Sequence, residues 1–211
     1  MYIAIEGVIG VGKTTLARLL QERFDAELRL EVFDENPFLS DFYADRARYA
    51  FQTQIFFLLS RYHQQNSFAP DILTKGKSLI TDYTFAKDAL FARINLVGDE
   101  LEMYYNVHDA LAEKIQLPEL IVYLQASTDV LMQRIARRDR PYERQMERAY
   151  IDTLNKAYEG FFDDYIKGVP VLRIPTDELD IVSSPQAQDQ VEQLIREAMQ
   201  SAPRQTQLPL E

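Results

Sequence analysis

The glycine-rich segment at residues 7–14 constrains this chain more than any other part of its sequence. It reads Gly-Val-Ile-Gly-Val-Gly-Lys-Thr and fits the pattern G-x-x-x-x-G-K-[ST] without a mismatch. The motif follows an apolar segment, residues 2–6, that is typical of a buried strand, and it opens an amphipathic segment, residues 13–24, that is typical of a helix. A glycine-rich turn beside a buried lysine is the alternative, but this context favours a phosphate-binding loop.

The parts of this loop have separate predicted roles. The glycines let backbone N–H groups converge on phosphate oxygens, and the helix N-terminus adds a partial positive charge. Lys13 is expected to reach the β- and γ-phosphates of ATP, and Thr14 is expected to offer its hydroxyl to Mg²⁺. The expected ATP-binding residues of the loop are Gly7, Gly10, Gly12, Lys13, Thr14 and Thr15.

Strand and helix patterns alternate along the whole chain. Strands are expected at residues 2–6, 27–32, 77–81, 120–124 and 169–174. Helices are expected at residues 13–24, 49–68, 85–96, 100–114, 128–135 (capped by Thr128), 147–166 and 186–199. The alternation predicts an α/β fold in which a five-stranded parallel sheet has helices on both faces. Residues 1–200 are expected to form a single domain, and residues 201–211 a disordered tail.

Composition excludes several classes of function. The net charge of −10 disfavours a protein that grips DNA or RNA, so no nucleic acid polymer is expected as a partner. The absence of cysteine excludes disulfides and cysteine metal sites, and two histidines make a histidine zinc site unexpected. Without a long apolar run or a basic leader pattern, neither a membrane anchor nor a signal peptide is expected, and the predicted location is cytoplasmic.

Two carboxylates stand where the strands are expected to end. Glu31 lies at the end of the second expected strand, and Asp82 closes an apolar run at the end of the third. Ligands of open α/β sheets bind at the carboxyl ends of the strands. Glu31 is therefore expected to act as a base towards an acceptor hydroxyl, and Asp82 to bind Mg²⁺ together with Thr14. The alternative is that Glu31 and Asp82 are ordinary exposed carboxylates at strand ends.

Residues 134–140 contain a run of four arginines in an otherwise acidic chain. A helix would place Arg134 and Arg138 on one face. Guanidinium groups suit phosphate oxygens and neutralise charge that develops during phosphoryl transfer. The run therefore predicts an arginine-rich lid over the phosphates, and a solvated charged face is the alternative.

These motifs together resemble the deoxynucleoside kinase family, most closely its bacterial deoxyguanosine and deoxyadenosine kinase branch. The resemblance spans roughly residues 1–175 and rests on residues 7–15, 31–39, 51–61, 82–83 and 134–143. It implies a P-loop kinase that uses ATP and Mg²⁺ to phosphorylate the 5′-hydroxyl of a deoxynucleoside, a purine one, for nucleotide salvage.

The resemblance also implies a role for individual residues. Glu31 would be the base for the 5′-hydroxyl. Gln54 would read the nucleobase with help from Asp88 and Arg61. Without the resemblance, the residues alone favour ordinary helix-surface polarity for Gln54 and Asp88. Tyr43 and Glu143 would hold the 3′-hydroxyl, and Tyr43 would crowd a 2′-hydroxyl. The implied catalytic residues are Glu31, Lys13, Asp82 and Arg134, and the lid arginines are Arg134, Arg138 and Arg140.

One residue departs from the family pattern. Members commonly carry arginine after the acidic residue of the third strand, where it contacts the reacting 5′ end, and here that residue is Tyr83. A phenol cannot supply the positive charge, so either the lid arginines or Lys13 are expected to replace it, or the acceptor is bound in a different position. Several members are homodimers that pack long helices together, which implies a homodimer through the helices at 49–68 and from residue 85. Burial of these helices within one chain is the alternative.

Other functions compete with this interpretation. A nucleoside monophosphate kinase of the thymidylate kinase type shares the fold and the loop, but Glu31 would repel its anionic acceptor. A non-catalytic module that senses nucleotides would need the loop but not Glu31. The preference among deoxynucleosides and feedback inhibition by a triphosphate are left open by the sequence.

Overall fold

The computed structural model describes residues 1–33, 35–165 and 168–201. The expected tail at residues 202–211 lies outside the described residues, as do Asp34 of the family-like segment and Ile166 at the expected end of a helix. Ser201, expected in the tail, is instead the last residue of the final helix.

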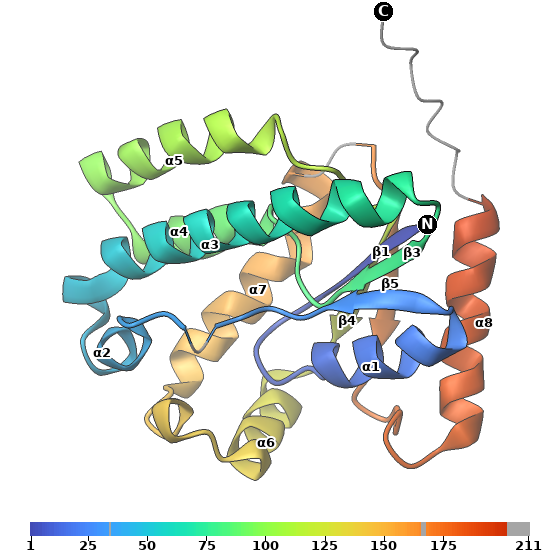
Figure 1. Ribbon diagram of the computed structural model, residues 1–211. Coiled ribbons are helices and arrows are strands. Elements are labelled where there is room, and N and C mark those ends of the chain that lie inside the picture. Colours follow the sequence, from blue (N-terminus) through green and yellow to red (C-terminus); the bar gives the residue numbers. More distant parts are fainter. Residues whose placement is uncertain (34, 166–167, 202–211) are drawn as a thin grey trace, which may run out of the picture.

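Five parallel strands form one sheet in the order β2-β3-β1-β4-β5 (Figure 1). Their bounds are β1 Tyr2–Glu6, β2 Ala26–Arg29, β3 Ser78–Thr81, β4 Leu120–Gln125 and β5 Val171–Pro175. All five residues of β1 are buried, which explains why the strand is apolar without alternation. The predicted five-stranded parallel sheet is confirmed. Because its strands run in one direction, the loops after β1, β2 and β3 meet at one edge.

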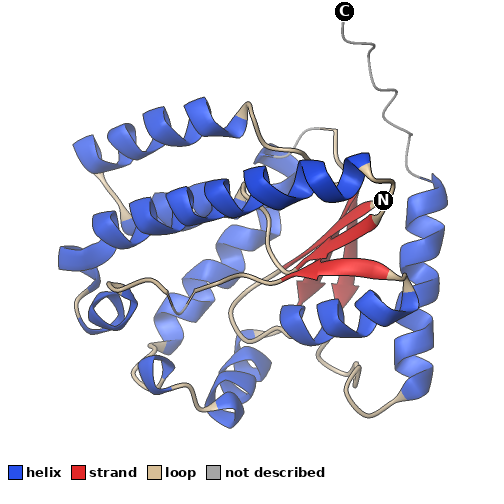
Figure 2. Cartoon of the chain, in the orientation of Figure 1, coloured by secondary structure: helices blue, strands red, loops and turns tan. Residues whose placement is uncertain are grey.

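Helices cover both faces of this sheet, as Figure 2 shows. On one side lie α1 and α8, and on the other lie α3, α4 and α7 (Figure 1). The bounds are α1 Lys13–Arg23, α2 Leu39–Ala44, α3 Arg46–Thr74, α4 Lys87–Asn95, α5 Gly98–Ala112, α6 Thr128–Arg138, η1 Pro141–Glu143, α7 Arg148–Tyr165 and α8 Pro185–Ser201. The expected layers are confirmed. The sequence analysis did not predict α2 and η1, because elements this short show no clear hydrophobic periodicity.

An aromatic cluster fills the space between β4 and α7. The Tyr123 and Tyr158 rings stack with centroids 5.9 Å apart, and Phe162 lies 5.2 Å from Tyr123. Burying these rings contributes roughly 1.5–3 kcal/mol each and anchors α7 to the sheet. These ring contacts fix the position of α7 against β4.

Several sequence predictions about element ends are wrong. The helix expected at residues 49–68 runs from Arg46 to Thr74, and Pro70 lies inside it. The second strand stops at Arg29, two residues before Glu31, because the Glu31 backbone N–H donates to the Asp82 carboxylate at 2.7 Å instead of to a strand. The cap of α6 is Ser127, whose hydroxyl accepts the Val130 N–H, whereas the Thr128 hydroxyl donates to Asp152.

The two helices expected to form a dimer surface differ in exposure. Most of α4 is buried beneath α3 and α5, so for this helix the alternative of core burial holds. The longer α3 leaves Leu59 exposed, and Met103 is exposed on the neighbouring α5. Within the described ranges, none of the helices combines the length and apolar character needed to cross a membrane.

Candidate active site

The phosphate loop joins the central strand β1 to α1. Gly7, Gly10 and Gly12 all have positive φ angles, of 143°, 87° and 109°, which favour glycine. At Gly7 a Cβ atom would also lie 2.5 Å from the Leu124 carbonyl oxygen of β4. Glycine is needed in this loop because a side chain would strain the backbone at these φ angles and, at Gly7, would collide with β4.

The ammonium group of Lys13 turns back over the loop. It donates to the carbonyl oxygens of Gly7 at 2.6 Å and Val8 at 3.1 Å. Burial, together with the positive charge of Lys87, lowers the pKa of Lys13 to about 8, despite opposing carboxylates nearby. A phosphate anion beside the ammonium would favour its charged form and raise this pKa again.

Asp82 connects the two predicted halves of the site. Its Oδ2 accepts the Thr14 hydroxyl at 2.5 Å, and its Oδ1 accepts the Glu31 backbone N–H. A hydroxyl and a carboxylate are the hard oxygen donors that Mg²⁺ prefers, and the ion commonly takes its remaining ligands from water and phosphates. The donor set of Thr14 and Asp82 therefore fits Mg²⁺. Among the described residues, groups of three or more acidic, histidine or cysteine side chains suited to a metal are absent.

Glu31 lies in a buried network of alternating charges. Its Oε1 accepts from Arg61 of α3, and Arg61 also pairs with Asp88 of α4. Its Oε2 accepts the ammonium of Lys87 at 2.5 Å. Burial would raise the pKa of Glu31, but the charges of Arg61 and Lys87 outweigh it and hold the pKa far below its usual range. Glu31 is thus ionised, as a group that receives a proton must be.

One cavity of about 800 Å³ contains both the loop and this network. The cavity lining includes every predicted site residue except Gly7, whose role is to shape the backbone: Gly10, Gly12, Lys13, Thr14, Thr15, Glu31, Tyr43, Gln54, Arg61, Asp82, Asp88, Arg134, Arg138, Arg140 and Glu143. Long-range folding has therefore gathered residues from many separate elements around one ligand-sized space.

Polar groups line the end of the cavity beyond Glu31. Gln54 and Asp88 are 2% and 1% exposed, so the alternative of helix-surface polarity is wrong for both. The Oδ2 atom of Asp88 is buried and has no hydrogen-bond partner among the described residues. Phe57 lies beside them, with the Arg61 guanidinium 5.0 Å from its ring. An aromatic ring beside a carboxylate, an amide and a guanidinium can pack on a flat heterocycle and hydrogen-bond to its edge.

Tyr142 connects Tyr43 with Glu143, because its ring packs on Tyr43 and it directly precedes Glu143 in the chain. The Tyr43 ring stacks on the Tyr142 ring with an interplanar angle of 12° and centroids 6.0 Å apart. Burial raises the pKa of the Tyr43 phenol well above its usual value, so its hydroxyl remains a donor. Glu143 is 4% exposed and accepts from Arg138 Nη2 at 2.6 and 2.7 Å and from Arg138 Nε at 3.1 Å.

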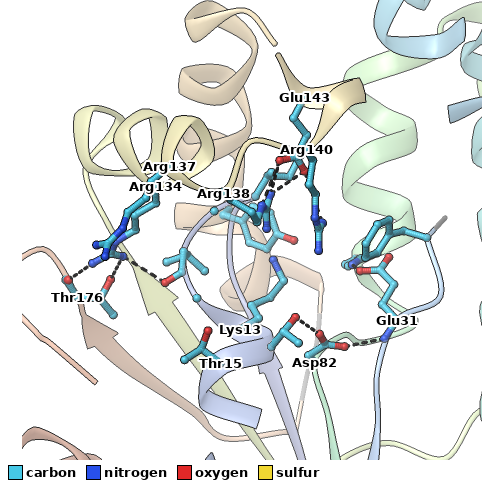
Figure 3. Close-up of a pocket in the computed structure, with 18 of the residues that line it drawn as sticks. Lys13, Thr15, Glu31, Asp82, Arg134, Arg137, Arg138, Arg140, Glu143 and Thr176 are labelled. Atoms are coloured by element: carbon cyan, nitrogen blue, oxygen red, sulfur yellow. Dashed lines mark hydrogen bonds and ion pairs between the residues drawn. The ribbon is translucent and has the colours of Figure 1, made fainter. Parts of the chain in front are cut away.

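The arginine run divides into two groups (Figure 3). Arg138 and Arg140 lie on the side of Glu143, whereas Arg134 and Arg137 lie on the side of Thr176. Arg134 donates to the Thr176 carbonyl at 2.6 Å and to the Val11 carbonyl of the loop at 3.2 Å. Arg134 and Arg138 thus point to different partners, although both leave the same helix, because their flexible ends follow the nearest acceptors.

Two features of the site escaped the sequence interpretation. The first is Lys87, which the sequence could have indicated as a single cation in an apolar segment, directly before Asp88. Residues 176–183, after β5, line the cavity at its other end, close to the phosphate loop through the Arg134 contacts. The sequence of this segment matches no motif, so its place in the cavity could not be predicted.

Comparisons with known proteins agree with this geometry. A family model described as deoxynucleoside kinase matches residues 3–200. Deoxyguanosine kinase of Bacillus subtilis is 36% identical over 175 residues, which cover 83% of this chain and 84% of the relative. Deoxyadenosine kinase of Dictyostelium discoideum is 34% identical, covering 82% of this chain and 71% of the relative.

A solved structure agrees as well. The deoxyadenosine kinase from M. mycoides with bound dCTP superposes with a TM-score of 0.79 at 26% identity, over 93% of this chain and 100% of that chain. The same enzyme with bound dATP gives a TM-score of 0.80. The resemblance inferred from the motifs is confirmed, and the chain belongs to the deoxynucleoside kinase family.

Proposed function

We propose that this kinase transfers the γ-phosphoryl group of ATP to the 5′-hydroxyl of a purine deoxynucleoside, deoxyguanosine or deoxyadenosine, for nucleotide salvage. The observation that supports this most directly is the single cavity that joins the phosphate loop to the buried Glu31 network. Relatives named deoxyguanosine kinase and deoxyadenosine kinase support the purine acceptor.

At the donor end, the loop N–H groups and Lys13 bind the phosphates of ATP. Thr14 and Asp82 would hold Mg²⁺, which neutralises charge on the β- and γ-phosphates when bound. Residues 176–183 line the cavity beside the loop, and we assign the adenosine of ATP to that end. Arg134, Arg138 and Arg140 act as the lid, with Arg138 and Arg140 nearer the acceptor.

At the acceptor end, Glu31 accepts the proton of the 5′-hydroxyl. The new bond forms between the 5′-oxygen and the γ-phosphorus while the bond to ADP breaks, and its electron pair stays on the β-phosphate oxygen. The deep burial of the Arg61 and Asp88 pair supports its use in reading the base together with Gln54. Tyr43 and Glu143 hold the 3′-hydroxyl, and the Tyr43 ring excludes a 2′-hydroxyl.

A substrate panel tests the proposal. ATP-dependent turnover is measured with the four deoxynucleosides, their ribose counterparts and their 5′-monophosphates. We expect turnover with purine deoxynucleosides and little with ribonucleosides. Turnover confined to monophosphates would instead identify an enzyme of the thymidylate kinase type, and ATP binding without any turnover would identify a nucleotide sensor.

We also propose a homodimer and a cytoplasmic location. Exposed Leu59 of α3 and Met103 of α5 support a surface over these neighbouring helices. Light scattering after size exclusion tests the dimer, and a monomeric mass at micromolar concentration would refute it. The cytoplasm supplies the ATP that the reaction consumes, and cell fractionation tests the location.

A further inference from the structure

Lys87 begins α4 and is buried, yet no part of the mechanism above uses it. Its ammonium lies 2.5 Å from Glu31 Oε2, and its side chain is 6% exposed. A buried lysine costs free energy unless its charge is compensated, so its presence beside the acceptor carboxylate calls for a role.

The other cations around the acceptor are already engaged. Arg61 is shared between Glu31 and Asp88 on the side of the nucleobase. Arg138 and Arg140 pair with Glu143, and Lys13 donates to carbonyl oxygens of the phosphate loop. In the described parts of the chain, the Lys87 ammonium pairs with Glu31 and with no further carboxylate.

Tyr83 directly follows Asp82 and cannot supply a charge to the acceptor. It is fully buried, and its hydroxyl donates to Gln64 of α3 at 3.1 Å. Tyr83 does not line the cavity, whereas Lys87, four residues later, does. The positive charge of Lys87 also lowers the pKa of Lys13, so the two ammonium groups interact electrostatically across the cavity.

We propose that Lys87 is the cation of the acceptor end and that its ammonium contacts the 5′-oxygen during phosphoryl transfer. The inference rests on the proposed function and deepens it. Of the three N–H donors, one keeps Glu31 in place, and the others are free for the 5′-oxygen and the arriving phosphoryl group. Arg61 differs in position, because it is shared between Glu31 and Asp88 on the side of the nucleobase, whereas Lys87 pairs with Glu31 alone among the described carboxylates.

The proton balance leaves Lys87 unchanged. The 5′-hydroxyl proton passes to Glu31, and the 5′-oxygen bonds to the γ-phosphorus as the bond to ADP breaks. Lys87 stays protonated throughout and stabilises the negative charge on the 5′-oxygen and on the transferred phosphoryl group. It thus acts at the side of the phosphoryl group opposite to the leaving ADP.

The test compares Lys87→Met, Lys87→Gln and Lys87→Arg with the surface control Lys75→Met. Lys75, directly after α3, is 61% exposed and pairs with Asp71 of that helix, so its loss removes an ion pair without touching the cavity. We expect the two neutral variants to lose about 10²–10³-fold in kcat, as for removal of one preorganised donor, with the KM for ATP changed less than about threefold. Lys87→Arg should recover at least about a tenth of the wild-type kcat, because it keeps the charge.

Thermal unfolding and ATP binding establish that each variant is folded. If one of the two neutral variants does not fold, the other still provides the test. Neutral variants with kcat within about threefold of wild type would overturn the proposal. So would a Lys87→Arg enzyme as inactive as Lys87→Gln, because the residue would then only support the structure. Failure of the proposed function is a separate result: the wild-type enzyme itself would turn over none of the deoxynucleosides.

Discussion

The Thr14 hydroxyl of the phosphate loop donates a hydrogen bond of 2.5 Å to the Asp82 carboxylate at the end of β3. The second oxygen of that carboxylate accepts the backbone N–H of Glu31. One side chain therefore connects the residue predicted to bind Mg²⁺ with the residue predicted to receive the proton. A change at Asp82 should affect both ends of the reaction.

Replacing Asp82 with asparagine is expected to lower kcat by at least about 10²-fold and to raise the Mg²⁺ concentration needed for half-maximal rate. An amide keeps the shape but removes the charge that attracts the ion. The measurement is the rate as a function of Mg²⁺ at saturating ATP. Asp71→Asn, at an exposed residue of α3, is the matched control. An unchanged Mg²⁺ requirement would remove Asp82 from the metal site.

Replacing Glu31 with glutamine is expected to lower kcat by about 10²–10⁴-fold, because the amide cannot receive the 5′-hydroxyl proton. The phosphate loop does not depend on Glu31, so the Kd for ATP should stay within about threefold of wild type. Single-turnover kinetics and calorimetry separate the two quantities. Near-normal turnover would show that Glu31 is not the base.

The same variant changes the response of stability to acid. The folded pKa of Glu31 is held below its unfolded value of about 4.3, so its charge stabilises the fold above that pH and this contribution is lost as pH falls through the lower folded value. The stability of Glu31→Gln should therefore depend less on pH below about 4 than that of wild type. Urea unfolding at several pH values measures the difference.

The lowered pKa of Lys13, about 8, predicts that ATP binding weakens in alkaline solution. The free enzyme loses the ammonium proton above this pH, and the phosphates bind the protonated form, so the Kd for ATP should rise towards about tenfold per pH unit. Calorimetry in EDTA from about pH 7.5 to 9.5 avoids titration of bound metal and measures the slope. Lys13→Arg should show no such slope, since arginine stays charged. A flat wild-type profile would contradict the prediction.

Gly7→Ala is expected to lower the free energy of unfolding by about 2–3 kcal/mol and to weaken ATP binding. The new Cβ would meet the Leu124 carbonyl oxygen at 2.5 Å, and the backbone has a φ of 143°. Gly98→Ala is the control, because its φ is also positive but its Cβ would meet nothing within 4 Å. Gly98→Ala should cost about 1–2 kcal/mol from backbone strain alone. Equal losses in urea unfolding would show that the contact with Leu124 is unimportant.

The sequence alone determined the elements whose signals are local. The phosphate loop needs glycines at set positions, a buried parallel strand needs a continuous apolar run, and both are legible within a few residues. For that reason the five strands, the loop residues from Gly7 to Thr15 and the carboxylate at Asp82 were predictable. The end of β2 was not, because it depends on a hydrogen bond between Glu31 and a residue of another strand.

The tertiary structure alone decided what the long charged side chains do. Lys87 and Arg61 reach Glu31 from two different helices, and Arg134 and Arg138 diverge from one helix to acceptors far apart in the sequence. Spacing along a chain specifies where a Cα atom lies on a helix, but several rotatable bonds separate it from the charge. The position of that charge is set by which acceptors the folded chain brings within reach, and by how costly it is to bury the charge without one.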